Sequence, residues 1–440
     1  MNILVINSPL FREKKLDYSA NYLPPLGLGY IATSIKLAGF SVELIDAVLK
    51  NLSVQEIINL INSKLPQFVV MNIFSTNQFL VKDIIQFSDS SIHFILGGGT
   101  RYLCEEILKW EIENYITIII GEGDFVVSAI ISGEITHNFL QKNSKKVIEI
   151  TPQSQYFPHD ISEIPIDHTF FENEPLKHHL GFNEAYISTS RGCIYNCGFC
   201  GSARSLNLEQ PRRERSIISI IKEISQLCDL YPELEVFRVL DDLFLVNKQS
   251  VERAYAIFQQ FSLEWRAMAH IKSISSLDEE EIKKLKHSGC KELFFGIESG
   301  SYKIQKLIHK INEPDVIKNS FENLFRYGIS VKAFFIFGFP NETEDDMLCT
   351  YNLATDIKNI SDDFPDVVFR TSVFQFRPYH GTELFEQLKI NYENISMIKE
   401  NKKLSHKIGR EQFNFVSHNF SNVSDDFLET IISKTVQLSC

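Results

Sequence analysis

Apolar and polar positions alternate between two spacings along the first 135 residues. Short apolar runs such as NILVIN (2–7) and FVVMNIF (68–74) have the length of buried strands. Between such runs, apolar residues recur every three or four positions, as at Leu28, Ile31 and Ile35, and this spacing predicts helices. Strands separated by helices need crossover connections. The pattern therefore predicts a Rossmann-like, doubly wound parallel sheet covered on both faces.

The rest of the chain divides into three further segments. Residues 136–184 carry several prolines and no sustained period, and we expect a linker there. Residues 185–390 return to the alternation with six strand–helix units. Six units favour a partial (β/α)6 barrel over a complete barrel of about 250 residues. Residues 391–440 are mixed, with a final helix expected near 425–436, and form a helical C-terminal tail.

Composition narrows the class of protein. The chain of 440 residues has 44 Lys and Arg against 56 Asp and Glu, a net charge of −12, so nucleic acid is not an expected partner. No apolar run reaches the roughly 20 residues of a membrane span. The start, MNILVINSPL, lacks the features of a signal peptide. Eight cysteines are too few for a disulfide scaffold. We expect a cytoplasmic protein whose cysteines are thiols or metal ligands.

Three of these cysteines form the motif Cys193-x-x-x-Cys197-x-x-Cys200, directly after the first expected strand of the second domain. Three thiolates within eight residues can converge on one soft metal centre. A structural zinc ion normally needs four ligands, and the chain has no second CxxC pair to supply them. A [4Fe–4S] cluster held by three cysteines leaves one iron open to a substrate or cofactor. The distant alternative is a zinc-stabilised binding module without enzymatic activity.

The triad resembles the signature of the radical S-adenosylmethionine (SAM) superfamily, which lies in the loop after the first barrel strand. Phe199 occupies the position whose aromatic ring packs near adenine in that family. Four later stretches resemble the motifs of its second, fourth, fifth and sixth strands: VLDDLF (239–244), GIESGS (296–301), FIFGFPNETEDD (335–346) and RPYHGTELF (377–385), the last with His380 in place of Pro.

The resemblance implies a [4Fe–4S] cluster on the triad and SAM as cofactor. The cluster would cleave SAM reductively, and the resulting radical would abstract hydrogen from an unactivated C–H bond. An electron donor such as a flavodoxin or ferredoxin is implied. The SAM contacts expected from the motifs are Phe199, Asp241, Asp242, Glu298, Ser299, Gly338 and Pro340.

No catalytic residue is assigned by the motifs. His270, Arg377 and Tyr379 follow or end expected strands and are candidate contacts to the substrate. For His270 the alternative is an ordinary strand histidine with its hydrogen bonds satisfied inside the protein.

The N-terminal segment resembles the B12-binding (cobalamin-binding) domain found in one subclass of the superfamily. The resemblance rests on NSPL, YLPPLGLGYIATSIKLAGFSVELIDA, FILGGGT and IIIGEGD. It implies that Gly97, Gly98, Gly121 and Gly123 border cobalamin. The chain contains no Asp-x-His-x-x-Gly motif, so no histidine ligand to cobalt is assigned, and cobalamin binding stays open.

Members with this pair of domains often methylate unactivated carbon. The leading interpretation is therefore a cobalamin-dependent C-methyltransferase that acts on a natural product or a peptide. The alternative is a cobalamin-independent epimerase or dehydrogenase of a peptide or small molecule. No motif identifies the substrate.

Overall fold

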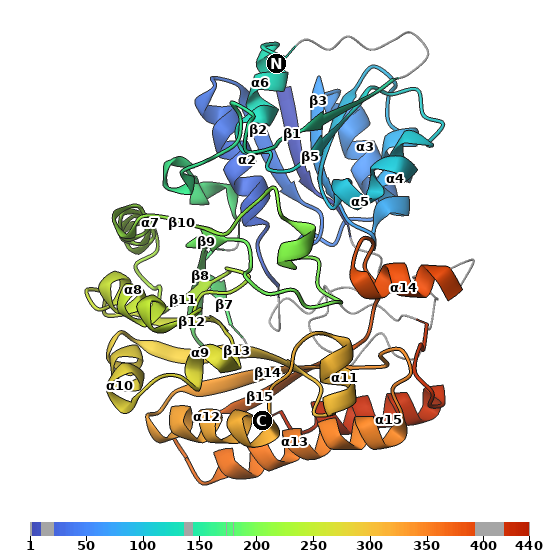
Figure 1. Ribbon diagram of the computed structural model, residues 1–440. Coiled ribbons are helices and arrows are strands. Elements are labelled where there is room, and N and C mark those ends of the chain that lie inside the picture. Colours follow the sequence, from blue (N-terminus) through green and yellow to red (C-terminus); the bar gives the residue numbers. More distant parts are fainter. Residues whose placement is uncertain are drawn as a thin grey trace. The chain divides into compact units, whose positions relative to one another are not determined.

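The computed structural model of the chain describes residues 2–9, 22–135, 144–172, 174–178, 180–391 and 418–439. The chain divides into two compact units, with the boundary between Glu174 and Pro175 (Figure 1). Each unit contains one large sheet. No helix within the described ranges is long and apolar enough to cross a membrane.

The first unit is a six-stranded parallel sheet with the strand order β2-β1-β3-β4-β5-β6. This is the Rossmann-like architecture that the alternating pattern predicts. Its elements are β1 (Asn2–Asn7), α2 (Leu26–Leu37), β2 (Ser41–Asp46), α3 (Val54–Lys64), β3 (Phe68–Ile73), α4 (Gln78–Gln86), β4 (His93–Gly98), α5 (Thr100–Leu108), β5 (Ile116–Ile120), α6 (Val126–Ser132) and β6 (Lys145–Glu149).

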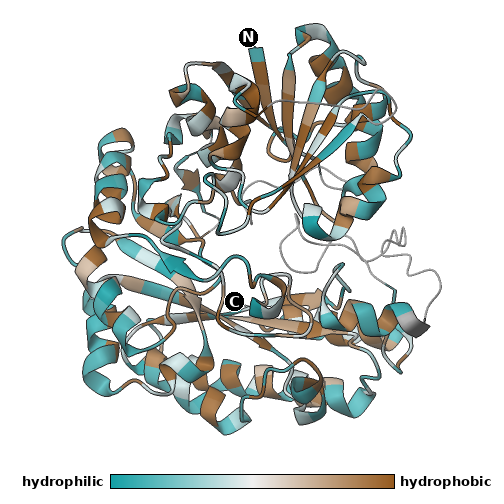
Figure 2. Ribbon diagram, turned by 45° about the horizontal axis from the view of Figure 1, so that its top comes forward, coloured by the Kyte–Doolittle hydropathy of each residue, from teal (hydrophilic) through white to brown (hydrophobic). Residues whose placement is uncertain are grey.

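Both faces of this sheet are apolar because successive strand residues point to opposite sides. In β1, Leu4 and Ile6 pack with residues of α3, α4 and α5, whereas Ile3 and Val5 pack with residues of α2 and α6. The strands of the first unit accordingly appear brown along most of their length in Figure 2. Continuous apolar runs such as NILVIN are the sequence signature of strands covered on both sides.

The structure corrects the expectation of an irregular linker over residues 136–184. Lys145–Glu149 forms β6, which pairs in parallel with β5 at the edge of the first sheet. The strand reads KKVIE, and it is only partly buried. Lysines on an exposed edge discourage pairing with other chains, but they also remove the apolar signal that marks the other strands.

The second unit has a seven-stranded sheet in the order β15-β14-β13-β12-β11-β8-β7, parallel from β8 to β15 and curled into a partial barrel. Its strands are β7 (Leu176–Lys177), β8 (Asn183–Ile187), β11 (Val236–Val239), β12 (Glu264–Ala269), β13 (Cys290–Glu298), β14 (Ser330–Phe337) and β15 (Phe369–Gln375). A two-stranded ribbon, β9 (Ser190–Arg191) with β10 (Arg213–Glu214), follows β8.

Helices cover one face of the second sheet. Two other helices, α11 (Tyr302–Leu307) and α14 (Glu383–Asn391), pack instead in a smaller apolar cluster with Phe339 and Phe376. The covering helices are α7 (Ile217–Leu230), α8 (Lys248–Phe258), α9 (Ile271–Ile274), α10 (Glu279–His287), α12 (Pro314–Arg326), α13 (Glu344–Asp362) and α15 (Asp425–Val436). The largest apolar cluster joins strand residues such as Trp265 and Phe335 to these helices, and it includes Leu428 and Ile432 of α15. The expected final helix is therefore confirmed, and it belongs to the helical layer of this unit.

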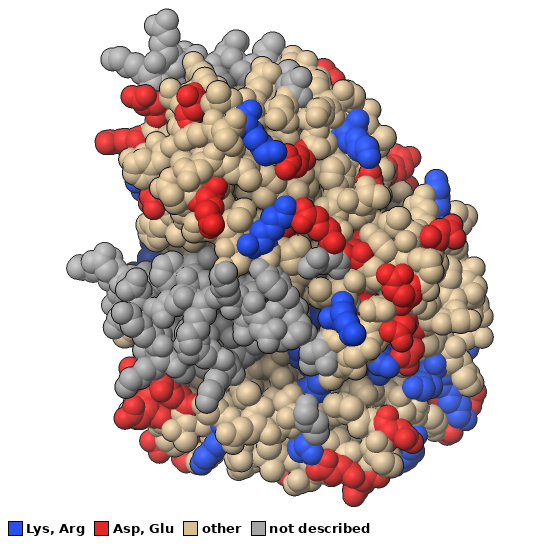
Figure 3. Space-filling model, turned by 180° about the vertical axis from the view of Figure 1, so that it is seen from behind, with Lys and Arg blue, Asp and Glu red and all other residues tan. Residues whose placement is uncertain are grey.

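Charged side chains are distributed rather than concentrated on the face shown in Figure 3. Among the residues drawn in colour there, Asp and Glu are interspersed with Lys and Arg. Mixed charge of this kind creates no extended field of one sign on that face.

Candidate functional site

The cysteine motif lies in the loop region that follows β8 and the short strand β9. Cys193, Cys197 and Cys200 are each partly buried, and each is a free thiol. The backbone N–H of Cys200 donates to the carbonyl of Cys197 over 3.1 Å, which closes a turn between two of the thiols. The triad therefore follows the carboxyl end of the first parallel strand, as the sequence predicts.

Contacts from three other segments fix this loop. The N–H of Gly198 donates to the carbonyl of Ile308 over 3.1 Å, and the N–H of Leu384 donates to the carbonyl of Gly198 over 3.0 Å. The Phe199 ring packs edge-on against Phe339, with ring centroids 5.9 Å apart. The middle of the motif is thus held by the segments that follow α11 and β14 and by the start of α14.

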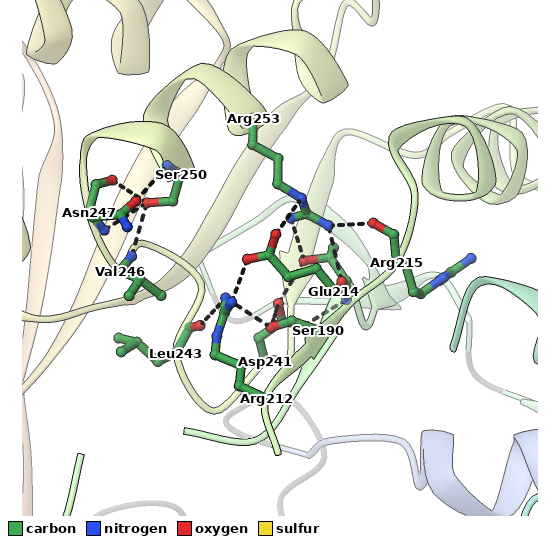
Figure 4. A network of polar contacts seen from close by, with 11 residues as sticks. Ser190, Arg212, Glu214, Arg215, Asp241, Leu243, Val246, Asn247, Ser250 and Arg253 are labelled. Carbon is green, nitrogen blue, oxygen red and sulfur yellow. Dashed lines mark hydrogen bonds and ion pairs between the residues drawn. The ribbon is translucent and has the colours of Figure 1, made fainter. Parts of the chain in front are cut away.

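A polar network holds the start of the loop (Figure 4). The carboxylate of Asp241 accepts hydrogen bonds from the N–H and hydroxyl of Thr189, both over 2.6 Å, and from the hydroxyl of Ser190 over 2.7 Å. Arg253 donates to the carbonyls of Thr189 and Arg215 over 3.1 and 2.9 Å. Burial raises the pKa of Asp241 despite these bonds. The side chain of Asp241, an expected SAM contact, is thus committed to positioning the loop.

Asp242 lies on the cysteine side of the same segment. Its carboxylate accepts a hydrogen bond from the hydroxyl of Ser202 over 2.9 Å, two residues beyond the triad. Burial raises its pKa, and its charge interacts with Cys193 and Cys200. Of the two neighbouring aspartates, Asp242 is the one beside the thiols.

Burial makes the bare thiolates unfavourable. The pKa of each thiol of the triad is raised by burial, that of Cys200 to about 12. A positively charged centre reverses this penalty, because metal ligation stabilises the thiolate. Within the described residues, no three His, Cys, Asp or Glu side chains are grouped closely enough to hold a metal ion. The donor chemistry of three free thiols on one anchored loop nevertheless fits an iron–sulfur cluster.

A buried ion pair lies beside the thiols. Lys310 Nζ is 2.9 Å from Glu298 Oε1; the Glu298 side chain is buried, and that of Lys310 is 11% exposed. Burial lowers the pKa of Lys310, but the charges of Glu298, Cys197 and Cys200 raise it on balance, so the lysine is cationic. Lys310 follows α11 and lies outside every motif identified in the sequence.

The backbone at the end of β13 aims Glu298 at this lysine. Glu298 has a φ of +65°, and the pairing of β13 with β14 is irregular between Gly296 and Glu298. A left-handed conformation at a non-glycine residue is uncommon and costs energy, so the surrounding fold must hold it. The next residue, Ser299, is fully buried, and its hydroxyl lies 3.0 Å from that of Thr350 in α13. Glu298 thus faces the site, and Ser299 anchors the strand end.

The turn after β14 has a similar internal support. The N–H groups of Gly338 and Phe339 both donate to Glu342, over 2.6 and 3.0 Å. Burial raises the pKa of Glu342 to about 8. Gly338 has a φ of +89°, and Pro340 is half-buried in the same turn. Glu342 organises the turn, although sequence reasoning did not single it out.

His270 reaches the triad through Tyr195. The two rings are stacked, with centroids 4.1 Å apart, and Tyr195 lies between Cys193 and Cys197. His270 Nδ1 accepts a hydrogen bond from the N–H of Lys272 over 3.1 Å. Burial, with Lys310 and Lys272, lowers the pKa of His270 to about 3. The ring is therefore neutral, with its proton on Nε2.

Arg377 and Tyr379 follow β15. Arg377 is buried, and burial lowers its pKa to about 10. Tyr379 interacts electrostatically with Arg377 and with Cys200. Two of the three candidate substrate contacts, His270 and Tyr379, therefore lie in the surroundings of the cysteine loop, and Arg377 lies beside one of them.

In the first unit, the glycines at the carboxyl ends of β4 and β5 have different roles. A Cβ added to Gly97 would meet no atom within 4 Å, and Gly98 and Gly121 have φ values of +93° and +108°. A Cβ on Gly123 would lie 3.2 Å from Ile31 of α2. Gly97 thus leaves open space at the strand end, which fits a flat cofactor, Gly98 and Gly121 permit the left-handed backbone, and Gly123 allows helix packing.

Polar side chains connect the neighbouring strand ends. Ser8 donates to the backbone carbonyl of Asn72 over 2.6 Å, and Asn77 Nδ2 donates to Ser8 Oγ over 2.7 Å. Asn7 Nδ2 donates to Asp46 Oδ1 over 2.8 Å. This cluster lies at the ends of β1, β2 and β3, where ligands bind in open parallel sheets.

The two units match two different protein families. Residues 187–354 match the radical SAM superfamily, and residues 16–131 match the B12 binding domain. The chain belongs to the radical SAM superfamily. Its second unit contains the radical SAM barrel with the triad, and its first unit contains a B12-binding domain. The chain is therefore an enzyme of this superfamily, in the subclass that the sequence motifs indicate.

Similarity to proteins named as methyltransferases extends over most of the chain. An uncharacterized methyltransferase of Pyrococcus horikoshii is 27% identical over 404 residues, which cover 87% of this chain and 84% of that protein. The cytidylyl-2-hydroxyethylphosphonate methyltransferase of Streptomyces wedmorensis is 22% identical, over 82% of this chain and 77% of that protein.

The fold is that of a solved radical SAM methyltransferase. The structure of TsrM from Kitasatospora setae, with cobalamin and a [4Fe–4S] cluster bound, aligns with a TM-score of 0.65 at 14% identity. The alignment covers 100% of this chain and 89% of that one. Both sheets therefore have counterparts in one known enzyme fold.

Proposed function

We propose that this radical SAM enzyme transfers a methyl group to an unactivated carbon of a small molecule or peptide, with cobalamin as the methyl carrier. The observation that carries the proposal is the pairing of a B12-binding domain with a radical SAM barrel, in the order and extent of known methyltransferases. A small-molecule substrate is supported by TsrM, whose structure is also known with its tryptophan substrate.

In this proposal Cys193, Cys197 and Cys200 hold the [4Fe–4S] cluster, and the glycine edge formed by Gly97, Gly98 and Gly121 borders the corrin. When bound, the cluster supplies the electron that cleaves SAM, and cobalamin supplies the methyl group. The protein's own side chains bind and orient these groups and keep water away from them.

The ion pair of Glu298 and Lys310 is the proposed site for the methionyl end of SAM. That end is a zwitterion, with one ammonium and one carboxylate group. Glu298 would accept hydrogen bonds from the ammonium, and Lys310 would donate to the carboxylate. Each residue would then bind a charged group of SAM in place of the other residue. Both charges stay paired inside the protein, which avoids the cost of an isolated buried charge.

Phe199 and the turn at Gly338 and Pro340 are the proposed surroundings of adenine. Phe199 packs on Phe339 of that turn, so both lie at the same end of the barrel. His270, Arg377 and Tyr379 stay candidate contacts to the substrate. We further propose a one-electron donor such as a flavodoxin or ferredoxin, and a reducing compartment such as the cytoplasm to keep the free cysteines reduced.

Product analysis tests the reaction type. Anaerobically reconstituted full-length protein, with a strong reductant, SAM and cobalamin, should release S-adenosylhomocysteine in at least the amount of bound cobalamin. Omitting cobalamin should abolish that release. Release of 5′-deoxyadenosine alone, in equal amounts with and without cobalamin, would overturn methyl transfer.

The second candidate is hydrogen abstraction without cobalamin, such as epimerisation or dehydrogenation. The specific observation in its favour is the polar cluster at the ends of β1 and β3, where Ser8, Asn72 and Asn77 bond to one another. The sequence there offers no histidine ligand for cobalt. The same product analysis separates this candidate from methyl transfer.

A further inference from the structure

The barrel face turned away from the helices carries buried charge. In β11, β12 and β14 the residues on both sides of each charged position belong to the apolar cluster under the helices, as Trp265 and Ala267 do around Arg266, and in β13 Leu293 beside Glu292 belongs to it. The charged residues between them therefore point to the opposite, inward face. These inward residues are Glu184, Arg238, Arg266, Glu292, Lys332 and Arg370, and all are buried.

Four of these residues form a closed network. Arg370 donates to both oxygens of Glu292, over 2.8 and 2.6 Å. Arg266 donates to Glu292 over 2.7 Å and to Glu184 over 2.5 Å. Two carboxylates thus neutralise two guanidinium groups across β8, β12, β13 and β15.

Two cations are left outside the network. Among the described residues, no hydrogen bond or ion pair joins Arg238 or Lys332 to an acceptor, and Arg238 Nε is fully buried without one. The guanidinium of Arg238 lies over the ring of Phe294, 4.6 Å from its centroid. Lys332 pairs with Phe294 in the register of β13 and β14. Phe294 is thus a neighbour of both residues, by its ring for Arg238 and by strand pairing for Lys332.

Uncompensated buried cations need an anion. A buried charge costs several kcal/mol unless it is paired, and a guanidinium is suited to bind carboxylate or phosphate oxygens. We propose that Arg238 and Lys332 bind an oxyanion of the substrate, a carboxylate or a phosphate or phosphonate group, on the inward face of the barrel sheet. The inference rests on the proposed function, because it assigns a chemical class to the substrate of that reaction.

The surroundings of Lys332 make this site sensitive to pH. Burial, with the charge of Arg370, lowers the pKa of Lys332 to about 7, although Glu292 acts against the shift. The other charged groups that act on Lys332 are Arg266 and Glu184. Above its pKa the lysine loses its charge, so anion binding should weaken as the pH rises through about 7.

Saturation-transfer NMR with two probes tests the proposal in the reconstituted full-length protein. Propionate and methylphosphonate represent the two anion classes, and each has methyl protons. Arg238→Gln and Lys332→Gln should each weaken binding of the preferred probe at least about tenfold, the effect of one lost charge-assisted hydrogen bond. Arg238→Lys should retain most of the affinity. The matched control is Arg326→Gln, which removes a positive charge from an exposed pair on α12.

The pH series uses propionate, which does not titrate near neutral pH. Its affinity should fall about tenfold between about pH 6 and about pH 8.5, and Lys332→Arg should remove that dependence. The ratio of affinities for propionate and methylphosphonate at the lower pH identifies the carboxylate or the phosphonate class.

Iron content and SAM turnover are measured on the same samples. The anion site would be overturned if the wild-type protein bound neither probe. It would also be overturned if Arg238→Gln and Lys332→Gln bound the probes with unchanged affinity. If Arg238→Gln does not fold, Arg238→Lys and Lys332→Gln decide the matter. A sample with iron and S-adenosylhomocysteine release but no probe binding rejects only the anion site. A sample that binds the probes but contains no iron and releases no S-adenosylhomocysteine rejects the proposed function instead.

Discussion

The two parallel sheets of this chain use polar residues in opposite ways. The first sheet is apolar on both faces, and its polar groups lie at the strand ends, where they are mostly neutral, as with Asn7, Ser8 and Asn72. The second sheet is apolar only toward the helices, and its inward face carries paired Arg and Glu side chains. The two units thus share a similar arrangement of strands and helices. The first has glycine-containing strand ends with mostly neutral polar groups, and the second has a charged inner face.

This difference matches the chemistry proposed for each unit. Cobalamin brings its own reactive metal and needs mainly space and shape at the sheet edge, which glycines provide. SAM and an anionic substrate are charged, so they need charges placed inside the protein before they bind. Variants in each unit can test whether the first depends on open glycine positions and the second on buried charges.

The largest expected effect is at the cysteine triad. Cys193→Ala should abolish cluster binding and SAM cleavage together, because an iron loses its thiolate. Iron content and 5′-deoxyadenosine or S-adenosylhomocysteine release are the measurements. Cys349→Ala, an exposed thiol on α13, is the control and should retain both. Full iron content in Cys193→Ala would remove the triad from the site.

The second prediction concerns the buried network. Glu292→Gln should destabilise the second unit by about 3–5 kcal/mol, because it removes the charged carboxylate to which both Arg266 and Arg370 donate. A Trp110→Phe background leaves Trp265 as the sole tryptophan, so its fluorescence during urea unfolding reports this unit. The control is the exposed ion pair of Glu322 with Arg326. Glu322→Gln should lower the free energy of unfolding by no more than about 1 kcal/mol. Equal effects would show that the network contributes little.

The third prediction concerns SAM binding. Glu298→Ala should weaken SAM affinity about tenfold to a hundredfold, because it removes one charge-assisted hydrogen bond worth about 1.5–3 kcal/mol. The cluster should survive, since no thiolate is changed. Equilibrium binding of SAM is measured alongside iron content. Unchanged affinity would place SAM elsewhere, and loss of iron would assign Glu298 a role in the fold.

The fourth prediction separates the first unit from the second. Gly97→Leu should weaken cobalamin binding about tenfold or more, since the side chain would fill the open space beyond β4. Iron content and SAM affinity should not change. Gly27→Ala, at an exposed and equally open glycine of α2, is the control. Wild-type cobalamin affinity in Gly97→Leu would contradict the assignment of this edge.

The smallest expected effect is at His270. Its pKa is lowered to about 3 in the folded protein, so below the unfolded value of about 6.5 only the unfolded chain takes up the proton. This group therefore makes stability fall by about 1.4 kcal/mol per pH unit below about 6.5, and it has no effect above that pH. His270→Gln should show a correspondingly smaller loss between about pH 7.5 and about pH 5.5. An identical loss in both proteins would mean that His270 is protonated in the fold.

Local patterns predicted much of this molecule. The continuous apolar runs of β1 and β3 and the helical spacing in α2 specify a parallel sheet, and the cysteine spacing specifies the loop that would hold a cluster. The strand β6 was not predicted, because KKVIE is short and polar at an exposed edge. Its pairing depends on its neighbour β5 rather than on its own residues.

Pairings between distant residues were not predictable from the sequence. Glu292 pairs with Arg266 across 26 positions and with Arg370 across 78, so no local sequence pattern marks the network. Lys310 was missed because a loop returns it to Glu298. Asp241 was expected to contact SAM, but its carboxylate bonds to Thr189 and Ser190. The sequence can thus predict that a residue lies at a strand end. Which residue it bonds to depends on the whole fold.

The metal content of the full-length protein tests the central claim most directly. After anaerobic reconstitution with iron, sulfide and cobalamin, followed by gel filtration, we expect about four iron atoms and about one cobalt per chain. Cys193→Ala should lose only the iron, and Gly97→Leu only the cobalt. Zinc in place of iron would contradict the cluster, and iron without cobalt would contradict a cobalamin-dependent methyltransferase.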